Sequence, residues 1–311
     1  INLFMMGVGH HEAAWRHPDT DPMQVTNIRH FQKLAQIAED AKFNSVFLAD
    51  GLATWNRAGH SVLGGLEPFT LLSALASVTE RIGLIGTVST TYNEPFHVAR
   101  KFASLDHISN GRAGWNIVTS ASDAEAYNFG LEGQIEHSLR YERAREFLEV
   151  VTSLWDSWED DARVEDKISG LYADVSKVHT VDHKGKWFSV QGPLNVPRPV
   201  QGYPLLVQAG SSEDGKGFAS EYAEAIFTAQ QTLAEAQAFY RDVKARAERA
   251  GRDPDGVIIL PGYSVTLGAS KDEALEKEAQ LHDLANPQRA VTMLSYFLNL
   301  ELSEADLDKP L

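Results

Sequence analysis

Two short segments carry side chains that could hold a phosphate group. Gly210, Ser211 and Ser212 follow a predicted buried strand and precede a predicted helix. Free N–H groups at a helix N-terminus bind anions, and the two hydroxyls add donors, although Ser212 could serve only as an N-cap. His137 and Tyr141 are four residues apart, so they share one face of a helix that starts there. A capped helix start with a packed aromatic ring has the same pattern, so both interpretations stay open.

Three polar residues stand at or near the ends of apolar, strand-length runs. Asp50 follows residues 45–49 directly, and Thr87 and Asn116 lie in comparable places on the next two runs. Each could be a cap or a packed polar group. If these runs are parallel strands of a barrel, their carboxyl ends converge on one mouth, where barrel enzymes place their sites. The pattern favours a shared binding site.

Common nucleotide motifs are absent. Gly7-Val8-Gly9 begins like a dinucleotide fingerprint, but Glu12 stands where the third glycine belongs, and a carboxylate there would repel a pyrophosphate. No P-loop pattern occurs either. We therefore expect neither NAD(P) binding by this motif nor P-loop phosphoryl transfer.

A histidine-rich stretch raises the question of a metal site. His10, His11, Glu12 and His17 are metal-ligand types, but adjacent histidines of a strand point to opposite faces. A structural or substrate-lining role is favoured, and no metal is predicted. The serine hydrolase motif G-x-S-x-G is also absent.

The sequence predicts alternating strands and helices, and these elements would position the residues described above. Seven apolar runs alternate with helix-length segments, which predicts parallel strands with helical crossovers. A doubly wound sheet satisfies the pattern, but polar strand ends spread over many units favour a (β/α)8 TIM barrel. The runs are residues 3–8, 45–49, 82–88, 113–119, 204–209, 225–229 and 257–267. The intervening helices are expected at residues 28–42, from 68, from 95, at 138–158, at 232–250 and from 270.

Two segments interrupt the alternation. Residues 159–203 are too long for a simple loop, and residues 178–181 and 187–190 flank a glycine-containing turn that predicts a β-hairpin. At the other end, the chain stops at Leu311 with no eighth apolar run. A barrel without its last unit would have two unpaired edges. We expect one barrel domain over residues 1–311, with an insertion at 159–203 and the last βα unit missing.

Composition narrows the class of protein. The 311 residues are 43% hydrophobic and 23% charged, which is typical of a globular chain with a large core. There is no cysteine, so thiol nucleophiles, zinc ribbons and disulfides are excluded. The formal net charge of −15 disfavours nucleic acid and anionic membranes as partners. No apolar run has the roughly 20 residues of a membrane span, and no signal peptide is recognisable, so a cytoplasmic location is expected.

Several short motifs follow one another in a fixed order along the chain. They are Trp15-Arg16-His17-Pro18, Phe47-Leu48-Ala49-Asp50, Thr90-Thr91-Tyr92-x-x-Pro95, Ser104-Leu105-Asp106-His107, residues 111–119, His137-x-x-Arg140-Tyr141, Lys177-Val178-His179, Asp182-His183-x-Gly185 and residues 208–212. Together they resemble the motifs of the bacterial-luciferase-like flavin monooxygenases, in the branch of nitrilotriacetate, EDTA and dibenzothiophene-sulfone monooxygenases. The similarity extends over residues 4–307.

The resemblance implies a (β/α)8 barrel that binds FMN at its carboxyl-end mouth. Reduced FMN would come from a separate NAD(P)H:flavin reductase by diffusion, and one atom of O2 would enter a small organic substrate. The residues implied to bind FMN are Asp50, Thr87, Asn116, His137, Tyr141, Ser211 and Ser212. His10 would face the flavin ring and is the candidate for acid–base assistance. A homo-oligomer is implied by the family alone.

Other functions stay open at the sequence level. A non-catalytic FMN-binding relative would share the fold and the mouth residues, and a metal-dependent barrel aldolase or hydrolase is a further alternative. The substrate is not identified, and cleavage of a C–N or C–S bond is the generic expectation. Arg16 and Arg57 are candidates for binding carboxylates, although surface roles are favoured.

Overall fold

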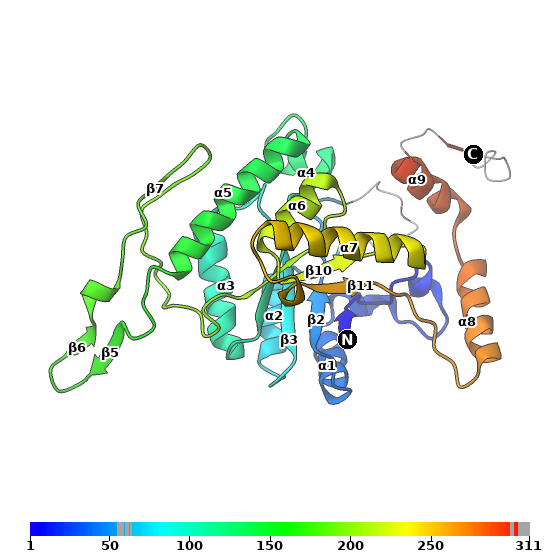
Figure 1. Ribbon diagram of the computed structural model, residues 1–311. Helices are drawn as coiled ribbons and strands as arrows, with labels where there is room; N and C mark the ends of the chain where they lie inside the picture. Colours follow the sequence, from blue (N-terminus) through cyan, green and yellow to red (C-terminus); the bar gives the residue numbers. More distant parts are fainter. Residues whose placement is uncertain (55–58, 60–61, 63, 299–301, 304–311) are drawn as a thin grey trace. The chain divides into compact units, whose positions relative to one another are not determined.

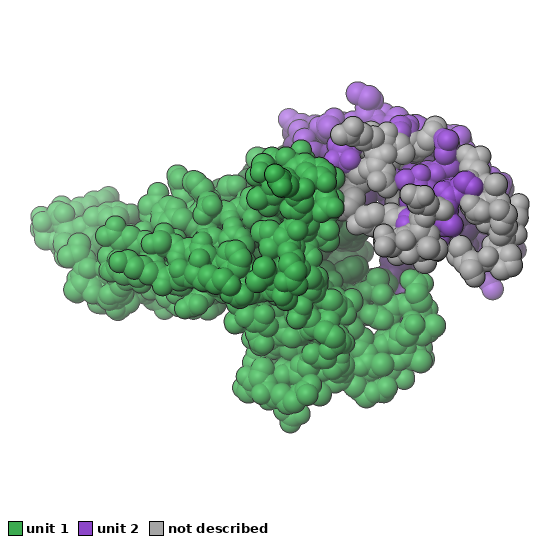
Figure 2. Space-filling model, turned by 90° about the horizontal axis from the view of Figure 1, so that it is seen from above, with its two compact units in different colours: residues 1–4, 32–51, 67–262 green, residues 5–31, 52–66, 263–311 purple. Residues whose placement is uncertain are grey.

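The computed structural model describes residues 1–54, 59, 62, 64–298 and 302–303. The chain divides into two compact units (Figure 2). Unit 1 comprises residues 1–4, 32–51 and 67–262, and unit 2 comprises residues 5–31, 52–66 and 263–311. The expectation of one barrel domain over the whole chain stays a prediction.

Unit 1 is built on a parallel seven-stranded sheet (Figure 1). Its order is β1-β2-β3-β4-β9-β10-β11, every neighbouring pair is parallel, and among the described residues β1 and β11 are its edges. Consecutive strands in this order and helical crossovers between them are the pattern of a (β/α)8 barrel. The strands are β1 (Asn2–Phe4), β2 (Ser45–Leu48), β3 (Gly83–Ser89), β4 (Ala113–Val118), β9 (Leu205–Gln208), β10 (Ala225–Thr228) and β11 (Ile258–Pro261).

The inner face of the sheet is packed with apolar side chains. Phe4, Phe47 and Phe227 lie with ring centroids 5.5 to 6.2 Å apart. Ile85 and Val207 are buried in the same cluster. Because strand side chains alternate between faces, the parity that turns Phe47 and Ile85 inward also turns Thr87 inward.

Helices cover the outer face. Trp115 of β4 is fully buried there, its ring lies 5.5 Å from that of Phe102 and 6.0 Å from that of Phe147, and its Nε1 donates to the Val88 carbonyl. The helices of this layer and its connections are α1 (Ile28–Asp40), α2 (Pro68–Ala76), α3 (Pro95–Ser109), α4 (Asp123–Asn128), α5 (His137–Trp155), α6 (Glu213–Tyr222) and α7 (Leu233–Arg249). A short 3-10 helix, η5 (Pro254–Gly256), precedes β11.

Some expected boundaries are wrong. The first run was expected to continue to residue 8, but β1 ends at Phe4. The Cβ that any other residue would carry at Gly7 would lie 2.9 Å from the Val25 backbone, so the chain turns there against that segment. The seventh run was expected to reach residue 267, but β11 ends at Pro261. Apolar residues alternate along this segment, which predicted a longer strand. The alternation does not bury them, because Tyr263 is 85% exposed.

The insertion at 159–203 carries two small antiparallel ribbons that extend beyond α5, away from the sheet (Figure 1). A hairpin is present, but its first strand is not where it was expected. Strand β7 (His183–Lys184) lies in the segment expected to be the turn, and residues 178–181 are not part of it, while β8 (Ser189–Val190) falls within the expected second strand. The other ribbon, β5 (Arg163–Asp166) with β6 (Leu171–Ala173), was not predicted, and the 3-10 helix η4 (Val175–Lys177) follows it.

Glu146 of α5 holds the β7–β8 hairpin. Its carboxylate accepts hydrogen bonds from the backbone of Trp187 (3.0 Å) and Phe188 (2.8 Å) and lies 3.1 Å from His183 Nε2. A Cβ at position 185 would lie 2.1 Å from Glu146 Oε1, so only glycine permits this approach. Burial acts to raise the pKa of Glu146, but the hydrogen bonds from His183, Phe188 and Trp187 outweigh it and leave the pKa below its ordinary value.

The Glu146→Gln variant is expected to lose about 2 kcal/mol of unfolding free energy at pH 7, because one acceptor of this network becomes a donor. A carboxyl group with a lowered folded-state pKa stabilises the fold above its unfolded pKa, and this contribution is lost as pH falls through the folded value. The difference between wild type and variant should therefore shrink below about pH 4. Urea unfolding at several pH values measures it.

The matched control for this prediction is Glu142→Gln, one turn earlier on the same helix. Glu142 pairs with Lys186 of the same hairpin, but both side chains are about half exposed. Its removal should leave the urea midpoint unchanged at every pH. Equal losses in the two variants would contradict the role given to Glu146.

Unit 2 is mainly helical in its described residues. It contains η1 (Ala14–Arg16), η2 (Pro22–Thr26), α8 (Lys271–Asp283) and α9 (Pro287–Leu298), as well as the start of α1. Nowhere in the described part of the chain is a helix both long and apolar enough to cross a membrane.

Candidate functional site

The sheet brings two of the predicted residues into direct contact. Thr87 and Asn116 are register partners on β3 and β4, and both are buried. Asn116 Nδ2 donates to Thr87 Oγ1 (2.8 Å), which in turn donates to the Leu48 carbonyl (2.8 Å). This chain fixes the asparagine amide. Its other polar atom, Asn116 Oδ1, is buried without a hydrogen-bond partner, which is costly unless a ligand or water donates to it.

Asp50 lies just beyond β2, at the same carboxyl end of the sheet. One of its carboxylate oxygens, Oδ1, accepts from the Gly51 N–H (2.9 Å). The pKa of Asp50 is raised, first by partial burial of the carboxyl group and then by the charges of Glu67 and Glu125, while the Gly51 hydrogen bond acts to lower it. Raised pKa values of this kind are common at binding sites.

The residues of the predicted anion site lie where α5 and α6 begin. His137 is the first residue of α5, and its ring centroid lies 5.1 Å from that of Tyr141. Tyr141 is buried, and its hydroxyl would lie 2.9 Å from a Cβ at position 215, in the first turn of α6. The structure therefore brings the phenol and the α6 N-terminus together, as expected.

Two glycines make room at this N-terminus. A Cβ at Gly210 would lie 2.9 Å from the Gly215 Cα, and one at Gly215 would lie 3.0 Å from the Gly210 Cα. Ser212 is the N-cap of α6, and its Oγ accepts from the Gly215 N–H (3.1 Å). Ser211 and Ser212 are both exposed. The loop thus presents hydroxyls and a helix N-terminus to a ligand, with little room for any side chain between them.

The Thr87–Asn116 pair and the Gly210–Ser212 loop are connected to neighbouring strands of the sheet. Asn116 of β4 is the register partner of Val207 of β9, and the Gly210–Ser212 loop follows β9 directly. Asp50, Thr87, Asn116, His137, Tyr141, Ser211 and Ser212 all belong to unit 1. The sequence predicts His10 at the end of the first strand, but the strand β1 ends at Phe4, and His10 lies beyond it in a bend that belongs to unit 2. Arg16, considered from the sequence, is engaged at the Leu284 carbonyl, and Arg57 lies outside the described residues.

Sequence analysis missed Asp214. Its Oδ2 lies 2.8 Å from His137 Nδ1 across 77 residues of chain. The pair uses one imidazole nitrogen and leaves Nε2 for a ligand. The sequence feature that could have pointed to Asp214 is the acidic first turn of the helix after Ser212. Acidic residues are common in the first turn of helices in general, so this feature did not indicate a partner on α5.

Arg140 and Gln134 were also missed as candidate site residues. Arg140 Nη1 donates to the Ser120 carbonyl, while its Nε is buried without a partner, as is Gln134 Nε2. Gln134 Oε1 accepts from the Tyr92 hydroxyl (2.9 Å). Two unpartnered buried donors in this unit, together with the Asn116 acceptor, fit a ligand that carries both acceptors and donors.

These observations fit FMN. Its phosphate can accept hydrogen bonds from donors at a helix N-terminus, and the α6 loop, Tyr141 and His137 carry donors of this kind. Its ring system carries N–H and carbonyl groups that can meet unpartnered polar atoms such as Asn116 Oδ1. Among the described residues, no group of three or more His, Asp or Glu side chains is placed to hold a metal ion.

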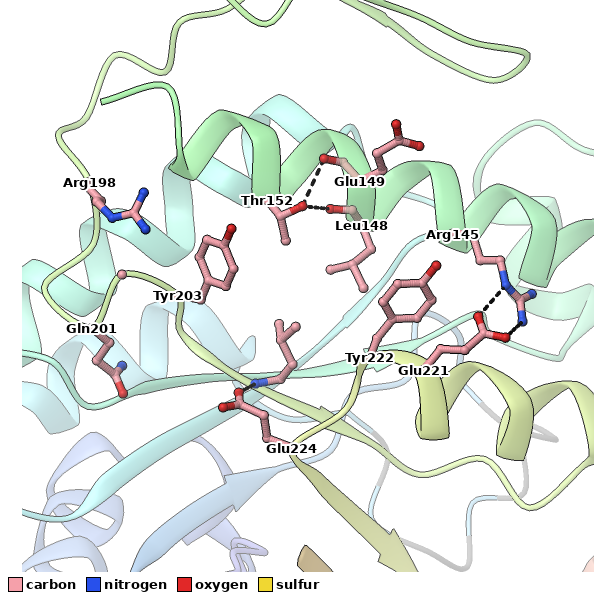
Figure 3. Close-up of a pocket in the computed structure, with 12 residues that line it drawn as sticks. Arg145, Leu148, Glu149, Thr152, Arg198, Gln201, Tyr203, Glu221, Tyr222 and Glu224 are labelled. Atoms are coloured by element: carbon pink, nitrogen blue, oxygen red, sulfur yellow. Dashed lines mark hydrogen bonds and ion pairs between the residues drawn. The ribbon is translucent and has the colours of Figure 1, made fainter. Parts of the chain in front are cut away.

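A cavity of about 700 Å³ lies elsewhere in unit 1, at the amino ends of β9 and β10 (Figure 3). Two of its lining groups are held by protein contacts. Arg145 and Glu221 form a two-bond ion pair (3.0 and 3.2 Å), and Glu224 accepts from the Leu206 N–H (3.0 Å). Since the cavity lies at the opposite end of the strands from the candidate site, we do not assign the cofactor to it.

The parallel sheet and the polar groups at its carboxyl ends define an α/β barrel protein whose candidate site lies at the ends of its strands. The chain belongs to the luciferase-like monooxygenase family, whose sequence model matches residues 6–305. The resemblance and the barrel class that the sequence predicts are thereby confirmed, and the chain is an enzyme of this family.

Two relatives cover nearly the whole chain. It is 50% identical to N-acetyl-S-(2-succino)cysteine monooxygenase of Bacillus subtilis (strain 168), over 100% of this chain and 71% of the relative. It is 48% identical to nitrilotriacetate monooxygenase component A of Aminobacter aminovorans, over 97% of this chain and 70% of the relative.

Solved structures of other proteins have the same fold as this chain. A long-chain alkane monooxygenase superposes with a TM-score of 0.90 at 35% identity, over 96% of this chain and 72% of the other. A riboflavin lyase solved with modified FMN and riboflavin gives 0.89 at 34% identity, over 96% and 70%.

Proposed function

We propose that this chain is the oxygenase of a two-component system, which uses reduced FMN and O2 to oxygenate a small organic substrate. The observation that carries the proposal is the glycine-lined α6 N-terminus against Tyr141, next to the partly unsatisfied Asn116 amide. Reduced FMN, when bound, supplies the electrons that activate O2. The chain's own residues bind and orient the flavin and keep water from the reaction.

The phosphate is assigned to the residues at the two helix starts. Ser211, Ser212 and the α6 N–H groups would donate to it, with the Tyr141 hydroxyl on the other side. His137 would donate through Nε2 while Asp214 holds Nδ1. The negative net charge of the chain does not prevent phosphate binding here, because the hydrogen-bond donors act at close range.

The ring side is assigned to the carboxyl ends of β2, β3 and β4. Thr87 holds the Asn116 amide so that Oδ1 can accept from a flavin N–H. Asp50 would bind flavin at the same end. His10 is proposed, from the family resemblance, to move a proton at the reacting centre.

The relatives' names define the substrate class that we propose. They act on a thioether, an amine and, in Rhodococcus erythropolis, a sulfone, each with a carbon next to a heteroatom. Oxygenation at such a position destabilises the C–S or C–N bond. We infer that the substrate is a small molecule of this type, and that the bond is cleaved.

A flavin reductase would supply reduced FMN, as the designation "component A" of one relative implies a second component. We infer that it acts by diffusion of the flavin, and that this chain forms a homo-oligomer. Oxygen uptake with an added NAD(P)H:flavin reductase tests the function over a panel of aminopolycarboxylates, sulfones and thioethers. Uptake that depends on one substrate class and yields oxygenated product is expected.

The non-catalytic FMN-binding relative predicts another outcome. It would consume O2 only by uncoupled oxidation of the flavin, with one H2O2 per flavin and no dependence on substrate. That result over the whole panel, with tight FMN binding, would contradict the enzymatic proposal.

A further inference from the structure

The β5–β6 ribbon of unit 1 exposes large apolar side chains to solvent. The ribbon and the residues that follow it extend beyond α5 (Figure 1), and their exposed apolar residues are Val164, Ile168, Leu171, Tyr172 and Val175. Ile168, in the turn between the two strands, is 99% exposed. A two-stranded ribbon is only marginally stable by itself, and apolar side chains that gather on a surface mark interaction sites. We therefore looked for a surface that the ribbon could contact.

Asp166 fixes the turn that carries Ile168. One carboxylate oxygen accepts from the Ile168 N–H (2.8 Å), the other accepts from the Ser169 hydroxyl (2.5 Å), and the Asp166 carbonyl accepts from the Gly170 N–H (3.0 Å). The turn therefore presents Lys167 and Ile168 in one conformation. Such pre-organisation lowers the conformational entropy that is lost on binding.

The cavity at the amino ends of β9 and β10 belongs to the same unit and has apolar walls. Tyr203 and Tyr222 point into it from two sides (Figure 3), and the buried side chains of Leu148 and Leu206 add apolar surface to its lining. Its volume of about 700 Å³ lies within the range of cavities that enclose a bound group. The cavity can therefore receive an apolar side chain together with its neighbour in sequence.

The same lining offers a carboxylate that its own arginines do not neutralise. Arg145 pairs with Glu221, and Arg198 pairs with Asp156. Glu149, which also lines the cavity, is exposed and is bound by neither arginine. A group that combines an apolar side chain with a cation is therefore complementary to this cavity.

We propose that the Lys167-Ile168 tip of one copy of the chain occupies this cavity in a second copy, and that the enzyme is a dimer with two such contacts. Ile168 packs against the rings of Tyr203 and Tyr222, and the Lys167 ammonium pairs with Glu149 of the partner subunit. Because every copy carries both the tip and the cavity, a two-fold axis forms the contact twice.

The base of the ribbon favours a second copy over the ribbon's own cavity. The Asp174 N–H donates to the Ala162 carbonyl (2.8 Å), and the Glu159 N–H donates to the Lys177 carbonyl (3.0 Å). These bonds direct the ribbon beyond the end of α5, away from the sheet (Figure 1). Insertion into its own cavity would require the ribbon to fold back and break them, whereas a second copy can approach the ribbon as it stands.

The inference rests on the homo-oligomer of the proposed function, whose contact it names, but it does not require flavin. The contact lies at the amino ends of the strands, and the candidate FMN site lies at their carboxyl ends. Dimer formation and FMN binding can therefore be measured independently.

The test is sedimentation equilibrium of the flavin-free 311-residue chain and its variants, at concentrations up to about 100 μM. The wild-type chain should be a dimer. Ile168→Asp should raise the dimer dissociation constant at least about 100-fold, because both apolar contacts are lost and each new carboxylate faces Glu149. Ile108→Asp is the matched control, since Ile108 is an exposed isoleucine on α3 of the same unit, and it should leave the constant unchanged.

Exchange of the two charges identifies the pairing. Lys167→Glu and Glu149→Lys should each raise the dissociation constant about tenfold, because like charges then meet at both contacts. The double variant should return it to within about threefold of the wild-type value. All three residues that are changed on the tip and the rim, Lys167, Ile168 and Glu149, are exposed, so the variants should fold.

A wild-type chain that stays monomeric would overturn the inference, as would a dimer that Ile168→Asp leaves intact or that the double charge variant does not restore. Equal losses in Ile108→Asp and Ile168→Asp would also overturn it. FMN titration of the same variants should give the wild-type affinity. A monomeric chain that binds FMN would refute only this inference, and a dimer that binds no FMN would refute only the proposed function.

Discussion

The Gly215→Ala variant is expected to bind FMN about 100-fold more weakly than the wild-type chain. The added methyl group would lie 2.9 Å from the Tyr141 hydroxyl, 3.0 Å from the Gly210 Cα and 3.1 Å from Ser212 Oγ. Real Cβ contacts are almost never this short, so the phenol and the loop must move apart. Those groups are the proposed phosphate donors, and the variant should therefore lose phosphate affinity. Quenching of FMN fluorescence on titration measures it.

The matched control is Gly217→Ala, two residues further along α6. There the new Cβ would meet only Arg145 Nη2, at 3.9 Å, and alanine favours the helix. This variant should bind FMN as the wild type does. Riboflavin, which lacks the phosphate, should bind the Gly215 variant and the wild type alike. If both glycine variants bound FMN equally well, the phosphate would have to be placed elsewhere.

The Asp106→Ala variant is expected to lose about 4 kcal/mol of unfolding free energy, since the buried backbone N–H of Ala113 and the backbone N–H of Gln201 both lose their acceptor. Asp106 is fully buried at the amino end of the sheet. It accepts from the backbone N–H groups of Ala113 (3.2 Å) and Gln201 (3.0 Å), and from Gln201 Nε2 (2.5 Å). It therefore joins the start of β4 to the chain that leads into β9. Urea unfolding followed by tryptophan fluorescence measures the loss.

Asp160→Ala is the control for that prediction. Asp160 is 92% exposed and pairs with Arg198 at the surface, so its removal should not shift the urea midpoint. FMN affinity of folded Asp106→Ala should equal that of the wild type, because Asp106 lies at the amino ends of the strands. A small stability loss combined with a large loss of FMN binding would contradict this assignment.

Features that depend on local chain were predictable from sequence. Ser212 caps α6 and His137 begins α5 because capping and helical spacing are local properties. Seven apolar runs gave seven parallel strands, since a covered sheet requires apolar residues on both faces. The motif around Asp106, which a reader could take for a site, proves to be a structural connection.

Features that depend on contacts between distant segments were not predictable. The His137–Asp214 pair joins the first turns of two helices that are 77 residues apart in sequence. The buried Arg289 nitrogens that lack a hydrogen-bond partner could not be predicted from the sequence either, because burial and hydrogen bonding are properties of the folded unit. Apolar and polar residues alternate over residues 263–267 as they would in a strand, yet Val265 is 70% exposed. A two-residue period of hydrophobicity is therefore not enough to predict that a segment joins the sheet.

We propose above that the chain transfers one atom of O2 to its substrate. The most direct measurement is mass spectrometry of the product formed under ¹⁸O2, with reduced FMN supplied by a separate reductase and a substrate found in the oxygen-uptake panel. We expect one labelled oxygen atom in the oxygenated fragment of each cleaved substrate molecule, reduced at once to an alcohol where it is a carbonyl so that the label does not exchange with water, and no product when FMN is omitted. An unlabelled oxygenated fragment, or turnover that persists without FMN, would contradict the proposed function.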